Sequence, residues 1–272
     1  MPVQVQYRKE WEEAGITDML SVIIPTHNEE GCIQSTVEKL IAVLQAESIA
    51  HEILVINDNS SDRTGEILVA MTPYCPTMRV INNTPPNGFG FAIRQGLLAF
   101  NGEAVALYMA DASDAPEDLV RFYRKLQEGY DCVFGNRFTK GGRVYNYPWP
   151  KLVLNRLGNL FIRLLLRTGY NDTSNAFKLY RRHVIAGLHP LLSYQFNITI
   201  ELPLKAIIRG YSFAVVPNSW ENRSHGISKF KIKEMGSRYL FIVFYCLIEK
   251  IFMQGEFSNL PTESEQCQNW TK

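Results

Sequence analysis

The chain has 272 residues, of which 46% are hydrophobic and 20% are charged, as expected of a globular protein with a buried core. Its 28 basic and 27 acidic residues leave a net charge of +1, which argues against a nucleic-acid-binding protein. The five cysteines form no CxxC pair, and this argues against a zinc site or a disulfide framework and favours a reducing compartment such as the cytoplasm.

Alternating strands and helices are predicted over the first half of the chain. Short apolar runs predict strands over 19–25, 52–57, 78–82, 104–109 and 131–135. Apolar residues at helical spacing predict helices over 31–46, 62–71, 90–101 and 116–128. Ser60 or Ser61 is the predicted N-cap of the second helix. Strands that are apolar on both faces and alternate with helices indicate an α/β fold, with a mostly parallel central sheet flanked by helices.

The second half of the chain has a different pattern. Residues 139–150 combine glycines, prolines and aromatic side chains, which predicts a long mobile loop that acts as a lid. Beyond this loop we predict a helix over 152–167, an edge strand over 215–220 and a strongly apolar helix over 234–253.

These elements divide the chain into one main domain and shorter flanking segments. The domain covers 19–233, and an N-terminal extension over 1–18 precedes it without the apolar segment of a signal peptide. The apolar helix over 234–253 and a polar tail over 254–272 follow it. The longest unbroken apolar run, 239–248, is about half as long as the roughly 20 residues that a membrane span needs.

Polar segments follow each of the five predicted strands. Ligands of parallel sheets bind beyond the carboxyl ends of the strands, and carboxylates there suggest Mg²⁺ or Mn²⁺ bridging to a phosphorylated substrate. Asp111 and Asp114 are the best candidates because they flank a tight turn directly after a strand. The alternative is a solvated turn in which Asp114 caps the following helix. Asp58, in a good turn sequence, has the same two interpretations.

Seven short motifs stand out, at 22–30, 55–64, 87–96, 110–117, 135–137, 172–178 and 223–229. In content and order they resemble those of the family 2 glycosyltransferases of the GT-A fold. Within that family the chain looks like the branch that acts on dolichol phosphate or polyprenyl phosphate. The resemblance extends from about Leu20 to Lys233, and it implies a Rossmann-like fold that binds a nucleotide-sugar donor.

The resemblance implies a donor site built from the first four motifs. Asp111 would hold a Mg²⁺ or Mn²⁺ ion at the donor diphosphate, with Ser113 or Asp114 as a further ligand. Met109 stands where many relatives have the first aspartate of an Asp-X-Asp motif, and Asn57 stands where they often have aspartate. The implied donor-binding residues, among which Asp58 contacts the base, are Pro25, Thr26, Asn28, Glu29, Asp58 and Gly90.

A phosphate acceptor is already an anion at neutral pH, so it needs positive charge rather than a general base. Arg137 follows the fifth strand, and Lys151 and Asn155, four residues apart on the next helix, share a face. The resemblance places these three residues at the lipid phosphate. Each isolated Arg or Lys is also explained as a solvated surface charge. A late motif that closes over the phosphates contributes Arg223, Ser228 and Lys229, with Ser228 at the acceptor.

Two apolar segments, 161–166 and 239–253, have two interpretations. They either pack in the core or in a homo-oligomer, or they lie on a bilayer surface with basic residues at the headgroups. The second interpretation predicts a cytoplasmic protein that is peripheral at the cytoplasmic face of a membrane. The basic residues are Arg163, Arg167, Arg238 and Lys250.

The resemblance implies an inverting glycosyltransferase that moves a sugar from GDP-mannose or a UDP-hexose to a polyprenyl or dolichyl phosphate, with Asp111, Asp114 and Arg137 as catalytic residues. One alternative keeps the donor site but uses a hydroxyl acceptor, as in polysaccharide or lipopolysaccharide assembly, and Asp114 is then the general base. Another alternative is a catalytically silent protein that binds a nucleotide sugar. Met109 favours it, because it replaces an aspartate of the metal-binding motif.

Overall fold

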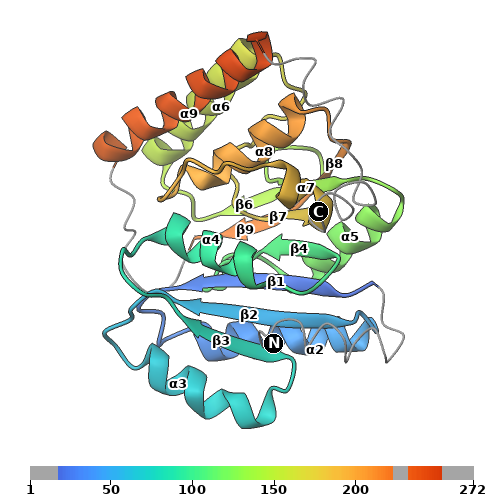
Figure 1. Cartoon of the computed structure of the whole chain (residues 1–272), viewed down its shortest axis with the longest axis vertical. Coiled ribbons are helices and arrows are strands. Elements are labelled where there is room, and N and C mark those ends of the chain that lie inside the picture. The colour runs from blue at the N-terminus through green and yellow to red at the C-terminus, as the bar shows by residue number, and fades with distance from the viewer. Residues whose placement is uncertain (1–17, 223–231, 253–272) are drawn as a thin grey trace, which may run out of the picture.

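The computed structural model describes residues 18–222 and 232–252, which form a central sheet between layers of helices (Figure 1). The sheet has seven strands in the order β3-β2-β1-β4-β7-β5-β8. Neighbouring strands are parallel, except that β7 is antiparallel to both β4 and β5. This confirms the predicted α/β class. The strands are β1 (Leu20–Thr26), β2 (His51–Asn57), β3 (Met78–Asn82), β4 (Ala104–Leu107), β5 (Cys132–Asn136), β7 (Lys178–Arg181) and β8 (Phe213–Pro217).

Helices cover both faces of the sheet because its central strands are apolar on both sides. Val37 of α2 and Phe122 of α5 are fully buried on one face, and Ile93 of α4 and Leu202 of α8 on the other. The helices are α2 (Ile33–Ala46), α3 (Thr64–Met71), the 3₁₀ turn η1 (Thr72–Tyr74), α4 (Phe89–Ala99), α5 (Pro116–Gln127), α6 (Trp149–Leu166), α7 (Arg182–Gly187), α8 (Ile198–Ile208) and α9 (Ile232–Phe252).

At one end of the molecule α6 and α9 lie side by side (Figure 1). Their inner faces form a separate core with α8, in which Ile162 of α6 and Ile242 of α9 are buried. Lys250 Nζ donates to the Leu166 carbonyl at 2.5 Å and ties the end of α6 to α9. Among the described residues, no helix combines the length and the hydropathy that crossing a bilayer requires.

The prediction of a loop throughout 139–150 is wrong in part. Within it β6 (Arg143–Tyr145) pairs in parallel with β9 (Ser219–Glu221), and α6 begins at Trp149. The single edge strand predicted over 215–220 is correspondingly split, since β8 ends at Pro217 on the sheet edge and β9 leaves the sheet. The two partners of the small sheet are far apart in the chain, so local sequence does not reveal their pairing.

The loops after β1 and β2 interlock, and this corrects the predicted cap of α3. The backbone N–H of Asn28 donates to Ser60 Oγ (3.1 Å), and that of Ser61 donates to Asn28 Oδ1 (2.7 Å). Both serines therefore belong to the loop contact, and neither caps α3. Asp62 Oδ1 instead accepts the N–H of Thr64, the first residue of the helix.

Gly90 lies in the first turn of α4, where the segment before α8 crosses it. A Cβ at this position would overlap the carbonyl carbon of Tyr194 and lie 2.5 Å from the backbone nitrogen of Gln195. The rings of Phe89 and Phe196 stack beside this crossing, with centroids 4.4 Å apart. This close packing is by itself enough to require glycine at position 90, and the assignment of Gly90 to donor binding stays a prediction.

We expect Gly90→Ala to lower the free energy of unfolding by about 2 kcal/mol, because the overlapping atoms are backbone and cannot swing aside. Urea unfolding followed by circular dichroism measures this. The control is Gly158→Ala in α6, where nothing lies within 4 Å of the added Cβ. We expect the control to gain up to about 1 kcal/mol from helix propensity. A Gly90→Ala protein as stable as the control would contradict the packing explanation.

Candidate active site

A cavity of about 520 Å³ lies at the carboxyl edge of the sheet. The residues predicted for the metal and, except Ser228, which lies outside the described residues, those predicted for the acceptor phosphate line it together. They come from the segment after β4, from the end of β5 and from the first turns of α6. These residues are Asp111, Ser113, Asp114, Arg137, Lys151 and Asn155.

The segment after β4 forms a tight buried turn. Ala112 has a positive φ of 56°, and Asp111 Oδ1 accepts the backbone N–H of Ser113 at 3.2 Å. Ser113 Oγ and Asp114 Oδ1 are buried and have no hydrogen-bond partner among the residues that the structure describes. Burial, followed by the neighbouring Asp111 carboxylate, raises the pKa of Asp114 to about 8. Two close carboxylates and an unsatisfied hydroxyl fit the oxygen-rich coordination of Mg²⁺ or Mn²⁺.

The structure also decides how Asp114 relates to α5. The residue at the N-cap of α5 is Ala115, and no side chain caps the helix, so the solvated capping turn is the wrong interpretation. Asp114 is 4% exposed and forms a β-bridge with Trp220 of β9, which closes over the turn. Met109 lines the same cavity. Among the described residues, no group of three His, Cys, Asp or Glu side chains is placed to hold a metal ion.

The pKa of Asp114 predicts how cation binding depends on pH. Because that pKa is about 8, the carboxyl is mostly protonated at pH 6 to 7 and a cation must displace the proton. We expect the apparent affinity for Mn²⁺ to rise about tenfold per pH unit up to pH 8. Thermal-shift titrations with Mn²⁺ at pH 6, 7 and 8 measure this. Asp114→Asn should make the Mn²⁺ affinity independent of pH over this range. A Mn²⁺ affinity that does not change with pH in the unchanged protein would contradict the prediction.

Arg137 reaches the cavity from the end of β5 and is 7% exposed. It forms a buried ion pair with Asp172, in which Arg137 Nη2 lies 2.7 Å from Asp172 Oδ1. Burial alone lowers the pKa of Arg137, but the Asp172 carboxylate outweighs burial and holds that pKa above its ordinary value. The sequence predicted the cation but not this partner, although Asp172 begins the sixth motif.

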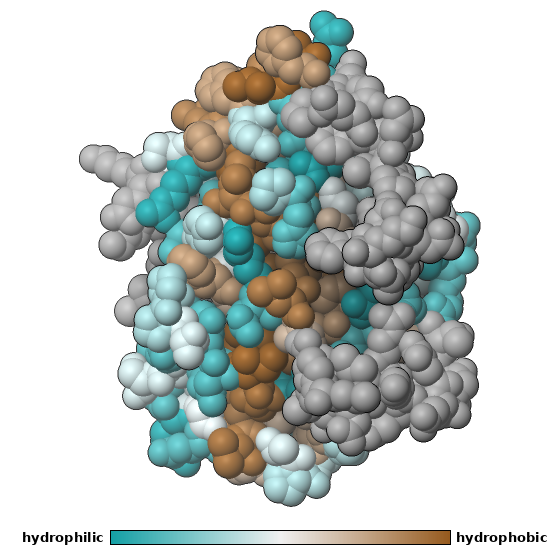
Figure 2. All heavy atoms as spheres, in the orientation of Figure 1, coloured by the Kyte–Doolittle hydropathy of each residue, from teal (hydrophilic) through white to brown (hydrophobic). Residues whose placement is uncertain are grey.

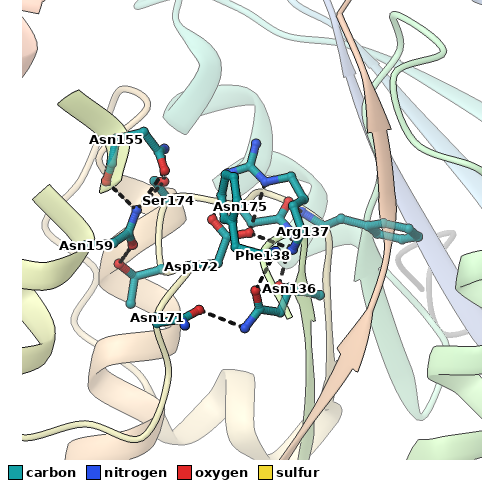
Figure 3. A network of polar contacts seen from close by, with 12 residues as sticks. Asn136, Arg137, Phe138, Asn155, Asn159, Asn171, Asp172, Ser174 and Asn175 are labelled. Atoms are coloured by element: carbon teal, nitrogen blue, oxygen red, sulfur yellow. Dashed lines mark hydrogen bonds and ion pairs between the residues drawn. The ribbon is translucent and has the colours of Figure 1, made fainter. Parts of the chain in front are cut away.

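Lys151 and Asn155 face the cavity from the first turns of α6, as their spacing predicts. Lys151 is exposed, whereas Asn155 is half-buried and donates from Nδ2 to Ser174 Oγ at 2.7 Å. Asn159, one turn further along, also donates to Ser174 Oγ (3.2 Å) and accepts from Thr173 Oγ1 (2.6 Å) (Figure 3). This amide cluster, which sequence reasoning missed, binds α6 to the loop before β7.

Lys178 of β7 is a second buried cation that sequence reasoning missed. It is 1% exposed, and its Nζ donates to the carbonyls of Thr173 (3.0 Å) and Thr199 (3.2 Å). Burial lowers the pKa of Lys178 to about 7. The only signal in the sequence was its place as the last residue of the sixth motif.

The other end of the cavity is apolar. Leu154 and Phe161 of α6 and Leu240 of α9 line it, and each is between 43% and 47% exposed. The cavity therefore joins a charged end, at the sheet, to an apolar end that continues onto the outer surface of α6 and α9.

The residues predicted for the nucleoside pocket lie outside this cavity, at the ends of β1 and β2. Pro25, Thr26 and Asp58 are buried, Glu29 is half-buried and Asn28 is exposed. The backbone N–H groups of Asn28 and Glu29 bind the loop that leads into α3. These contacts join the segments that follow β1 and β2 at this edge of the sheet.

Asp58 is 6% exposed, so the interpretation as a solvated turn is wrong for this residue as well. Its Oδ1 accepts from Asn83 Nδ2 (2.8 Å), and its Oδ2 accepts from the backbone N–H of Gly88 (2.9 Å). Each carboxylate oxygen can accept two hydrogen bonds, so these contacts hold Asp58 in place and leave capacity for a ligand. The remaining predicted site residues, Arg223, Ser228 and Lys229, lie outside the described residues.

Comparison with solved structures defines the fold family. Glucosyl-3-phosphoglycerate synthase from Mycobacterium tuberculosis, crystallised with Mn²⁺, UDP and phosphoglyceric acid, matches with a TM-score of 0.64 over 94% of this chain and 84% of that chain, at 17% identity. The same synthase with Mg²⁺ and UDP matches with a TM-score of 0.62 at 18% identity. The fold, with its carboxylate-bearing sheet edge, is that of the GT-A glycosyltransferases.

The chain belongs to glycosyl transferase family 2, whose family model matches residues 21–188. Polyprenol monophosphomannose synthase of Mycolicibacterium smegmatis is 34% identical over 238 residues, which cover 82% of this chain and 88% of that protein. Dolichol-phosphate mannosyltransferase of Pyrococcus furiosus is 30% identical over 217 residues, which cover 79% of this chain. The match spans 60% of the length of that second relative. These comparisons confirm the predicted family, and the chain is a glycosyltransferase.

Proposed function

We propose that this glycosyltransferase transfers a hexose, with inversion, from a nucleotide diphosphate sugar to the phosphate of a polyprenyl lipid. The observation that carries the proposal is the single cavity that joins Asp111 and Arg137 to an exposed apolar surface. A phosphorylated isoprenoid has the same two-part chemistry, an anionic head and an apolar chain. The names of the two relatives, which specify mannose and a polyprenol or dolichol phosphate, favour GDP-mannose as the donor.

The donor side of the proposal uses the edge of the sheet. Asp58 would contact the base, and Asp111, Ser113 and Asp114 would hold Mg²⁺ or Mn²⁺. The bound cation would stabilise the negative charge that develops on the leaving nucleoside diphosphate. Because the described residues supply few ligands, phosphate oxygens of the donor would complete the coordination. The two M. tuberculosis synthase structures contain Mn²⁺ or Mg²⁺ together with UDP.

The acceptor side of the proposal uses charge rather than base catalysis. A lipid phosphate is ionised at neutral pH, so no group has to remove a proton from the attacking oxygen. Arg137, Lys151 and Asn155 line one end of the cavity and would bind and orient that phosphate. Arg137 would also place positive charge near the reacting phosphates.

The outer faces of α6 and α9 would contact the bilayer from which the lipid comes, so the protein would be peripheral at the cytoplasmic face. Figure 2 shows apolar residues at the end of the molecule where Figure 1 places these helices, in a band that continues down the same face. The inner faces form core, as one of the two sequence interpretations predicts, so the outer faces are the part of these segments to which the bilayer interpretation applies. Lys250 Nζ donates one hydrogen bond to the Leu166 carbonyl of α6, and the headgroup contact predicted for Lys250 stays a prediction. The exposed large apolar residues are Trp149, Val153, Leu154, Leu157, Leu160, Phe161 and Leu164 on α6, and Leu240, Phe241, Phe244, Ile248, Ile251 and Phe252 on α9.

Sugar transfer from labelled donors to extractable lipid tests the proposal. The donors are GDP-mannose, UDP-glucose and UDP-N-acetylglucosamine, each with Mn²⁺, with Mg²⁺ or with a chelator. The acceptors are a polyprenyl phosphate and the matched polyprenol, which differ only in the phosphate. We expect metal-dependent transfer to the phosphate from one donor. Transfer to the alcohol would favour the hydroxyl-acceptor alternative, and donor binding without transfer or hydrolysis would favour the silent binder.

A further inference from the structure

The guanidinium of Arg137 is held on one edge by a single carboxylate. Asp172 Oδ2 accepts from the backbone N–H of Arg137 (3.0 Å) and from Nε (2.9 Å), while Oδ1 accepts from Nη2 (2.7 Å). A fork of two parallel bonds fixes the plane of the guanidinium as well as its position. Because Nε and Nη2 occupy one edge, the edge that includes Nη1 is outside the fork.

Three aromatic rings surround the same guanidinium. The centroids of Phe138, Tyr147 and Trp220 lie 5.4, 6.0 and 5.8 Å from Arg137 Cζ. They come from the end of β5, the loop before α6 and β9, so three separate elements enclose the cation. Arg137 is 7% exposed within this enclosure, and such burial strengthens its ion pair and leaves the side chain few other orientations.

Asp172 is itself anchored on several sides, although it lies in a loop. It is 0% exposed, and its backbone carbonyl accepts the N–H of Asn175 at 3.0 Å. The neighbouring Asn171 accepts from Asn136 Nδ2 (2.8 Å), and Thr173 is bound by Asn159 of α6 (Figure 3). The loop is therefore fixed to β5 and to α6, the two elements that carry the cationic end of the cavity.

We propose that Asp172 is the positioning residue for the acceptor phosphate: it aims the edge of Arg137 that includes Nη1 at the cavity and does not itself touch substrate. This inference rests on the proposed function for the nature of the acceptor. A purely structural ion pair would only tie β5 to the loop before β7. Weakening such a pair would leave acceptor binding unchanged, whereas weakening a positioning pair would impair it. The proposed role also differs from that of a general base, which would act without Arg137.

Steady-state kinetics separate these roles. We expect Asp172→Asn to raise the KM for polyprenyl phosphate about 10- to 100-fold, the range that a charge-assisted hydrogen bond is worth, and to leave the KM for GDP-mannose nearly unchanged. The matched control is Asp131→Asn, which removes a carboxylate that joins two loops at the opposite end of β5 through Ser212. An unchanged acceptor KM in Asp172→Asn would overturn the proposal.

A double-mutant cycle covers the case in which Asp172→Asn folds poorly. Arg137→Met combined with Asp172→Asn leaves no unpaired buried charge, so the double variant should fold. If Asp172 acts only through Arg137, the double variant and Arg137→Met will have the same acceptor KM and kcat. A further loss in the double variant would show that Asp172 acts on substrate directly and would overturn the proposal.

A crystal structure of Asp172→Asn supplies a readout that does not depend on the acceptor. We expect Arg137 Cζ to leave its place among the three rings, and an unmoved guanidinium would overturn the proposal. Wild-type protein that transfers sugar only to another acceptor would contradict the proposed function. A displaced Arg137 in the variant would still uphold Asp172 as its positioning residue, so the two failures are distinguishable.

Discussion

Asp111→Asn is expected to lower sugar transfer at least about 100-fold, because it removes a charged ligand of the cation that stabilises the leaving diphosphate. The loss should appear in kcat for transfer from GDP-mannose to polyprenyl phosphate at saturating Mn²⁺. Metal-induced stabilisation in a thermal-shift assay should weaken in parallel. The fold should survive, since the substitution removes one of two close carboxylates and so relieves the repulsion that helps to raise the pKa of Asp114.

The control for this prediction is Glu66→Gln, which neutralises an exposed carboxylate on α3. It should retain full transfer activity and metal response. Full activity in Asp111→Asn with a normal dependence on Mn²⁺ would contradict the metal site and place the cation elsewhere. If the variant loses transfer but binds the metal normally, Asp111 is not a metal ligand and has another role in the reaction.

The double substitution Phe241→Glu and Phe244→Glu is expected to abolish binding to lipid vesicles. Both rings lie on the outer face of α9, where they are 59% and 49% exposed. Each buried Phe contributes about 1.5–3 kcal/mol, so losing two should weaken partition by at least about 100-fold. Sedimentation with vesicles of phosphatidylcholine and phosphatidylglycerol measures the change. Transfer to a short, water-soluble prenyl phosphate should persist, since the charged end of the cavity is unaltered.

The matched control places two glutamates on an exposed apolar surface at the opposite end of the molecule. Val69 of α3 is 71% exposed and Tyr74 of η1 is 58% exposed, and α3 lies far from α9 in Figure 1. Val69→Glu with Tyr74→Glu should bind vesicles like the unchanged protein. If both double variants bind vesicles equally, the apolar face is not a bilayer contact. In that case light scattering tests whether the face binds a second copy of the chain. A dimer in the unchanged protein and a monomer in the Phe241→Glu and Phe244→Glu variant would assign the face to that dimer contact.

Much of the fold follows from the hydrophobic pattern. Strands buried on both faces are continuous apolar runs, and helices on a sheet carry one apolar stripe, so each predicted element of the first half appears within two residues of its place. The positions of Asp111, Ser113 and Asp114 at the cavity follow from a related rule, because parallel strands bring their carboxyl ends to one edge. The shared face of Lys151 and Asn155 follows from helical spacing alone.

The sequence by itself therefore determined the class of fold, the family and the edge of the sheet that carries the chemistry. Only the tertiary structure decided that Asp172 holds Arg137, that β7 enters the sheet antiparallel with Lys178 buried in it, and that Gly90 is a packing residue. Each of these facts depends on a contact between segments far apart in the chain. Buried charges and polar groups require partners, and which distant residue supplies the partner is set by how the layers pack, not by the local pattern.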